Sequence, residues 1–139
     1  MANISPKIKL LIRERAKHCC EYCKSPDSFS TELFSCEHIL PKAKNGSDDI
    51  DNLAFACIGC NIFKSDKIKG KDSISGGVFS LFNPRIMEWE GHFIWNNTFQ
   101  QIIGKTAIGR VTIETLKLNR QPLQNLRKAL VAVGVHPPT

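Results

Sequence analysis

The sequence lacks any long apolar segment. In its 139 residues, no window approaches the roughly 18 apolar residues that a membrane-spanning helix needs. The first residues do not place a charged stretch before an apolar one, so we expect no secretory signal, a cytoplasmic location and no membrane partner. Internal repeats and low-complexity segments are also absent. These absences leave an ordinary globular chain, of which 42% is hydrophobic.

Acidic residues are scarce. The chain has 13 Asp and Glu residues against 19 Lys and Arg residues, which gives a net charge of +6. A basic balance of this kind favours an anionic partner, either nucleic acid or an acidic membrane surface. A basic protein that is merely soluble is the plainer interpretation. Charge alone does not decide between these possibilities.

Six cysteines stand out in a chain for which a reducing compartment is expected. Disulfide frameworks are rare there, and paired Cys-x-x-Cys motifs more often bind metal or do redox work. Cys20 with Cys23, and Cys57 with Cys60, form two such pairs, whose four thiols predict one closed, structural zinc site. Cys19 could replace Cys20 in the first pair, although Cys20 gives the spacing of the second pair. Unligated thiols are the other alternative.

The first half of the chain alternates helix and strand signals. Ser5 and Pro6 predict a helix start, with Ser as the N-cap and Pro at the first helical position. Apolar, β-prone stretches predict two short strands, and Asn45-Gly46 predicts a turn between them. The expected elements after the first helix are a strand at 34–39, a loop at 41–52, a strand at 53–56 and a helix at 60–69.

The second half begins after Ser73-Ile-Ser-Gly-Gly77, which is typical of a linker. Strands are expected around Phe93 and Ile102, and helices where apolar residues recur at helical spacing, from Ile108 and again from Leu123. We therefore predict two parts, residues 1–76 and residues 77–139. The second part would be an extension, a hairpin and two helices, packed on the first.

Between the two Cys pairs lie Glu37-His38 and Asn52, and Asn61 follows the last Cys directly. The stretch from Glu37 to Asn61 closely resembles the HNH endonucleases with a ββα-metal motif, and the resemblance covers roughly residues 15–70. It implies an α+β fold: a ββα-metal (His-Me finger) core with a structural four-Cys zinc site, to which a small C-terminal strand and helix extension is added.

The resemblance also implies roles for these residues. His38 would be the general base that takes a proton from water. Glu37 and Asn61 would hold a catalytic Mg²⁺ or Mn²⁺, since oxygen ligands suit these hard cations. Asn52 would brace the loop or orient the His38 ring. Glu37 stands where many members have Asp or His, and Asn61 stands where the family name expects a final His. These two differences would affect which metal is preferred and the rate of hydrolysis.

Two placements follow from general geometry. Neighbouring residues of a strand point to opposite faces, so Glu37 and His38 should lie where the strand ends if both address one phosphate. Lys64, one turn after Asn61, is interpreted as a solvated helix lysine, with a phosphate contact as the alternative.

We therefore expect a metal-dependent endonuclease that hydrolyses phosphodiester bonds of double-stranded DNA. The alternative is a zinc-ribbon module that binds nucleic acid without catalysis, in which His38 would be dispensable. A thiol redox protein using Cys20 and Cys23 is disfavoured by the lack of a thioredoxin-like βαβ pattern. No helix-turn-helix or homeodomain is visible, so we expect weak sequence preference, or targeting supplied by a protein partner. The oligomeric state stays open.

Overall fold

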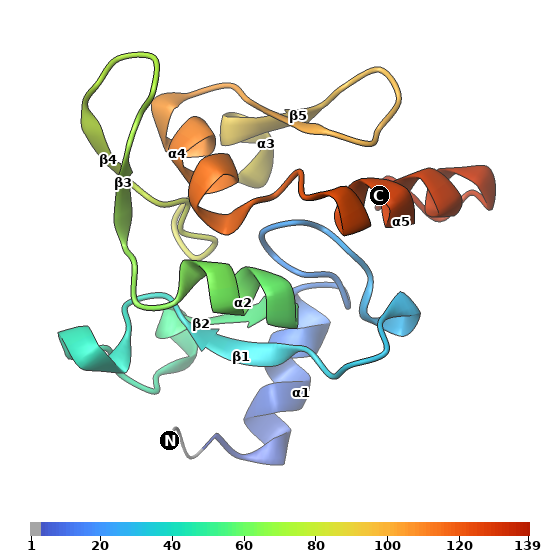
Figure 1. The fold of residues 1–139 in the computed structure, drawn as a ribbon. Coiled ribbons are helices and arrows are strands. Elements are labelled where there is room, and N and C mark those ends of the chain that lie inside the picture. Colours follow the sequence, from blue (N-terminus) through green and yellow to red (C-terminus); the bar gives the residue numbers. More distant parts are fainter. Residues whose placement is uncertain (1–3) are drawn as a thin grey trace. The chain divides into compact units, whose positions relative to one another are not determined.

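The computed structural model describes residues 4–139 and has mixed α and β structure (Figure 1). The chain divides into two compact units. The first comprises the described residues up to Ile68 together with Asn83–Ile86, and the second comprises Lys69–Phe82 and Met87–Thr139. The sequence predicts the boundary between the two parts at residues 76 and 77, whereas the structure divides the chain after Ile68. No helix of the described part is both long and apolar enough to cross a membrane.

The first unit is a short antiparallel hairpin between helices. Its elements are α1 (Pro6–Arg15), β1 (Ser35–His38), β2 (Leu53–Ala56) and α2 (Ile58–Lys64), with short 3-10 helices at Asp27–Phe29, Lys42–Lys44 and Ile50–Asn52. β1 and β2 pair antiparallel, so that Glu37 lies opposite Ala54 and His38 opposite Leu53. Ile12, Leu53 and Phe55 form the buried apolar cluster. In this order His38 ends β1 and Asn52 directly precedes β2, whereas Asn61 lies within α2.

Local signals set most of these boundaries. The predicted start of α1 is confirmed, because the Ser5 hydroxyl accepts a hydrogen bond from the Ile8 amide at 3.2 Å. The predicted turn at Asn45-Gly46 is confirmed as well, with Asn45 in the left-handed region at φ 67°. The helix predicted for 60–69 is wrong at both ends. Cys57 caps α2 with its sulfur, and Ser65, at φ 51°, ends it after Lys64.

The second unit holds two further hairpins and three helices. Its elements are β3 (Lys69–Lys71), β4 (Val78–Ser80), α3 (Trp89–His92), β5 (Phe93–Trp95), β6 (Ile102–Gly104), α4 (Ala107–Leu116) and α5 (Gln121–Ala132). The strands near Phe93 and Ile102 and both long helices are confirmed. The linker predicted at 73–77 is wrong, because this segment is the turn that joins β3 to β4. Trp89 stacks between Phe93 and Trp95 in the core of this unit.

Candidate functional site

Four cysteines of the first unit converge on one point. The sulfurs of Cys20, Cys23, Cys57 and Cys60 lie within 4.8 Å of one another, and all four residues are buried. In each pair the sulfur of the first cysteine accepts the backbone N–H of the second, at 3.5 Å and 3.4 Å. Burial raises the pKa of the Cys20 thiol well above its ordinary value. Four buried sulfurs this close together could hold a structural zinc ion.

The first Cys pair also positions the two residues between its cysteines. The Glu21 carboxylate accepts the Phe55 N–H at 2.8 Å and pairs with the Arg85 guanidinium. Tyr22, whose side chain is buried, donates its hydroxyl to the Glu37 carboxylate at 2.9 Å. The two residues between Cys20 and Cys23 thus contact β2 through Glu21 and Glu37 through Tyr22. The Cys-x-x-Cys pattern gave no signal for these contacts, because their partners are far away in sequence.

His38 is the last residue of β1, and its side chain is 14% exposed. Its Nε2 lies 2.7 Å from a carboxylate oxygen of Asp48, in the loop between the strands. The Lys42 ammonium lies 3.0 Å from the same oxygen. The hydrogen bond from His38, followed by that from Lys42, holds the pKa of the Asp48 carboxyl below its ordinary value. Asp48 therefore stays ionised and accepts a hydrogen bond from the N–H of Nε2.

Asn52 closes the loop that carries Asp48. Its Oδ1 accepts the Leu40 N–H at 2.8 Å, and its Nδ2 donates to the carbonyls of Leu40 and Ser47 at 3.0 Å and 2.8 Å. Gly46 allows the loop to approach Leu40 closely, because a Cβ at this position would lie 1.6 Å from the Leu40 carbonyl oxygen. No hydrogen bond joins Asn52 to the His38 ring among the described residues. The Asn52 side chain therefore contacts the loop and not the His38 ring.

Glu37 points the other way, into the interior. Its carboxylate and the Lys64 ammonium are 2.5 Å apart, and each side chain is 2% exposed. Lys64 also donates to the carbonyls of His38 and Ile39, at 3.3 Å and 3.0 Å, and so ties α2 to the end of β1. The interpretation of Lys64 as a solvated lysine is wrong. Burial raises the pKa of the Glu37 carboxyl, and the charge of Lys64 opposes that rise.

The two expected ligands of the catalytic cation differ in their surroundings. Asn61 is half-buried on α2, and the structure records no hydrogen bond of its side chain within residues 4–139. The Glu37 Oε2 accepts a hydrogen bond from Tyr22, whereas the buried Oε1 is paired with the Lys64 ammonium. A carboxylate and an amide oxygen suit Mg²⁺ or Mn²⁺ chemically. A cation on Oε1 would have to displace Lys64.

The comparisons with known proteins place this site in a family. The two strands and the following helix form a ββα unit beside a four-Cys cluster that could hold zinc. The model of the HNH endonuclease family matches residues 20–67, from the first zinc cysteine to just beyond α2. This segment is an HNH domain of that family, as the motif predicted. Searches of curated proteins and of solved structures gave no match.

The Glu37–Lys64 pair predicts a large effect on stability. Replacing Lys64→Met leaves the Glu37 carboxylate buried without its cation, so we expect the free energy of unfolding to fall by about 3–5 kcal/mol. Lys67→Met, at an exposed lysine of the same segment, should change it by less than about 0.5 kcal/mol. Urea unfolding measures both. Adding Glu37→Gln to Lys64→Met should recover part of the loss, and equal stability of the two single variants would contradict a buried ion pair.

Proposed function

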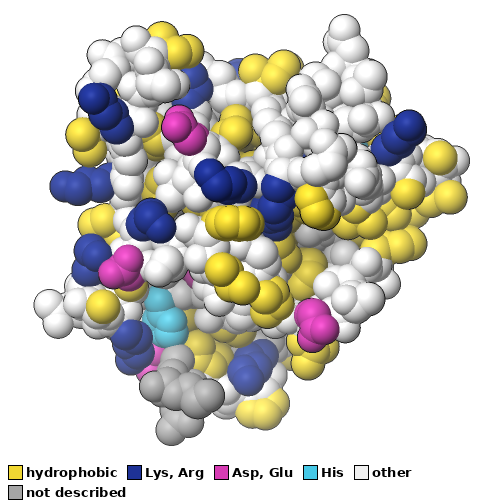
Figure 2. Space-filling model, in the orientation of Figure 1, with side chains coloured by type: hydrophobic (Ala, Val, Ile, Leu, Met, Phe, Trp, Pro, Cys, Tyr) yellow, Lys and Arg dark blue, Asp and Glu magenta, His cyan; other side chains and the backbone are white. Residues whose placement is uncertain are grey.

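We propose that this protein is a metal-dependent endonuclease that hydrolyses phosphodiester bonds of double-stranded DNA. The observation that carries the proposal is His38, at the end of β1 in the HNH domain, with its Nε2 bound to Asp48 at 2.7 Å. Nucleic acid is the substrate class of the family, and the net charge of +6 suits it. Figure 2 shows Lys and Arg side chains spread over the face it displays, with few acidic ones.

In this proposal His38 is the general base. Because the Asp48 carboxylate accepts a hydrogen bond from the N–H of Nε2, the lone pair of the imidazole lies on Nδ1. The described residues supply no hydrogen-bond partner to Nδ1. Nδ1 takes a proton from a water molecule as its oxygen forms a bond to phosphorus. The bond from phosphorus to the 3′ oxygen breaks, and this oxygen takes a proton from solvent. His38 then returns its proton to solvent.

We propose that Glu37 and Asn61 hold the catalytic cation, Mg²⁺ or Mn²⁺. When bound, such a cation neutralises charge on the phosphate and on the leaving oxygen. The Glu37 Oε1 is paired with the Lys64 ammonium, so it would reach the cation only after Lys64 moves aside. The zinc site is closed by four thiolates and leaves no position for substrate. Its proposed role is therefore to hold the strands and helix that carry His38, Asn52 and Asn61.

One observation favours a second candidate, a zinc-containing module that binds nucleic acid without cutting it. The Glu37 carboxylate is already neutralised by Lys64, which is what a purely structural pair would look like. The two candidates share the zinc site and the basic charge but differ in their need for His38. We further propose a cytoplasmic protein, in keeping with six free cysteines, and a protein partner that supplies targeting.

The experiment that separates these candidates is plasmid nicking. Purified, zinc-loaded protein is incubated with supercoiled plasmid, with and without added Mg²⁺ or Mn²⁺. The nuclease proposal expects relaxed circles only when the divalent cation is added. Plasmid that is bound but stays supercoiled with either cation would support the binding module instead.

Asp48 gives a second, finer prediction. Asp48→Ala removes the acceptor that fixes the His38 ring, so we expect the single-turnover nicking rate to fall by about 10- to 100-fold, since small misplacements of a catalytic group have effects of this size. The Kd for DNA should not rise, because the variant removes a negative charge. Asp49→Ala is the matched control: this neighbouring carboxylate is exposed and has no recorded side-chain partner in the described chain.

The comparison of the two variants decides the role of Asp48. Equal rates for Asp48→Ala and Asp49→Ala would show that the contact to His38 does not matter. A faster Asp48→Ala variant would show that the carboxylate blocks the base rather than positions it. Asn at position 48 keeps an oxygen acceptor, so partial rescue by Asp48→Asn would support positioning.

A further inference from the structure

The hairpin of β3 and β4 in the second unit is small and unusually exposed. Each strand has three residues, and nearly every side chain from Lys69 to Ser80 faces solvent. A two-stranded hairpin is marginally stable on its own. Its shape must therefore be maintained by other contacts, and the structure shows two sets of them.

The first set lies along α4. Gly70, in the middle of β3, faces this helix so closely that a Cβ would lie 3.1 Å from the Thr115 hydroxyl and 3.5 Å from Val111. The absence of a side chain lets the strand lie directly against the helix. Because side chains alternate along a strand, Lys69 and Lys71 then point away from α4, and both are exposed.

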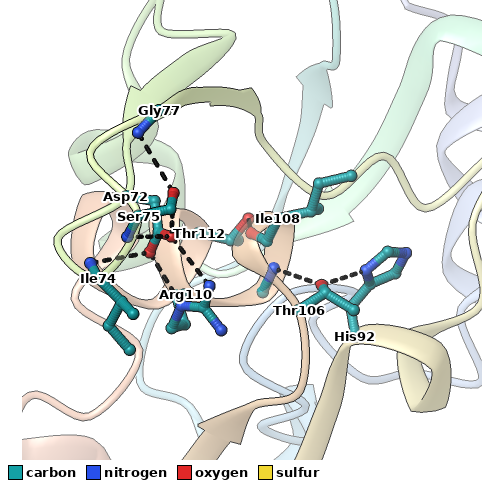
Figure 3. A network of polar contacts seen from close by, with 10 residues as sticks. Asp72, Ile74, Ser75, Gly77, His92, Thr106, Ile108, Arg110 and Thr112 are labelled. Carbon is teal, nitrogen blue, oxygen red and sulfur yellow. Dashed lines mark hydrogen bonds and ion pairs between the residues drawn. The ribbon is translucent and has the colours of Figure 1, made fainter.

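The second set is centred on Asp72, which is fully buried at the start of the turn (Figure 3). Its carboxylate accepts hydrogen bonds from the backbone amides of Ile74 and Ser75 and from the Ser75 hydroxyl at 2.7 Å. The Arg110 guanidinium of α4 adds two parallel bonds of 2.9 Å each. A bidentate pair of this kind fixes geometry as well as charge. The turn is therefore held rigidly on α4.

These supports leave a basic, partly apolar outer face. Asp72 is the one acid between residues 69 and 80, and Arg110 neutralises it in the interior. The charge that the hairpin shows to solvent is therefore positive, from Lys69 and Lys71. Beside it, Ile74 at the turn is 75% exposed and Val78 is 62% exposed. Figure 2 shows basic side chains over this hairpin.

We propose that the β3–β4 hairpin docks into the major groove of duplex DNA, with Lys69 and Lys71 on backbone phosphates and Ile74 against the base edges. The proposal rests on the proposed function, which makes DNA the substrate. The major groove accommodates a two-stranded β-ribbon, and apolar side chains contact thymine methyl groups there. A rigid turn suits this role, because little conformational entropy is lost when it binds. The hairpin would supply the substrate contact that no helical recognition motif provides.

The test measures binding to a labelled DNA duplex without cleavage. The His38→Ala variant serves as the background, and no Mg²⁺ or Mn²⁺ is added, so loss of nuclease activity cannot affect the result. Each phosphate contact contributes about 0.9 to the slope of log K against log salt. Lys69→Gln with Lys71→Gln should therefore weaken binding severalfold at low salt and reduce the slope by about 1.8. Ile74→Ala should weaken binding without a change in slope.

The matched control is Lys117→Gln with Lys128→Gln, which removes the same charge from exposed positions elsewhere in the second unit. This pair should leave the slope almost unchanged. An equal effect of both pairs would overturn the proposal, because the hairpin would then contribute only net charge. Unchanged binding in the hairpin variants would also overturn it, while leaving the nuclease proposal intact. A failure of the His38→Ala background to bind any duplex would count against both proposals.

Discussion

His38→Ala should abolish most nicking of supercoiled plasmid, with a fall in the single-turnover rate of about 100-fold or more. General bases contribute about 10²- to 10⁴-fold to such reactions, and His38 is the one histidine between the two Cys pairs. Its side chain lies at the end of β1, outside the buried apolar cluster, so its removal should not unfold the domain. Binding of DNA and zinc content should match those of the unchanged protein.

The matched control for this variant is His18→Ala. His18 belongs to the same unit and has a similar chemical character, but its Nε2 contacts only Glu14 of α1, at 3.0 Å. Its replacement should leave the nicking rate within a factor of about two, as for a surface change away from the site. Equal nicking by His38→Ala would point to a contaminating nuclease or to another base, and the assignment of His38 would fail.

The motif and its zinc frame could be predicted from the sequence because their signals are local. Ser5 before Pro6 marks a helix start wherever it occurs, and Asn45-Gly46 marks a turn. The two Cys pairs need only the right spacing to predict one metal site, and the structure places their sulfurs within 4.8 Å. The strand at Leu53–Ala56 was visible because it is short, apolar and bounded.

The electrostatic surroundings of the motif could not be predicted, because their partners are distant in sequence. The sequence indicates a solvated helix lysine at position 64, because no residue near Lys64 in the sequence shows that Glu37 lies 2.5 Å away in the interior. Asp48 lies in the loop predicted at 41–52, and only the folded loop brings it to His38. The sequence indicates a linker at 73–77 for the same reason. The hydrogen bonds that hold Asp72, at the start of this turn, come from Arg110, which lies in a later helix.

Loss of zinc should unfold the first unit. The apolar cluster of this unit consists of Ile12, Leu53 and Phe55 with partly buried neighbours, and a core of this size rarely supplies more than about 3–5 kcal/mol. Structural zinc contributes on the order of 10–16 kcal/mol of binding free energy that is available only to the folded state. The purified protein should therefore contain about one zinc per chain, and chelation should remove the fold of this unit together with nicking.

Cys57→Ser tests the same point without a chelator. Cys57 belongs to the four-Cys cluster proposed to bind zinc and also caps α2 through its sulfur, so the variant should lose zinc and become unfolded in the first unit. Cys36→Ser is the matched control, because Cys36 lies in β1 outside the four-Cys cluster. The single tyrosine of the chain, Tyr22, is buried beside the cluster, so a fluorotyrosine label reports on this unit alone. A native Tyr22 signal in zinc-free protein would show that the thiols pack as core residues, and the zinc site would then not be what holds His38 in place.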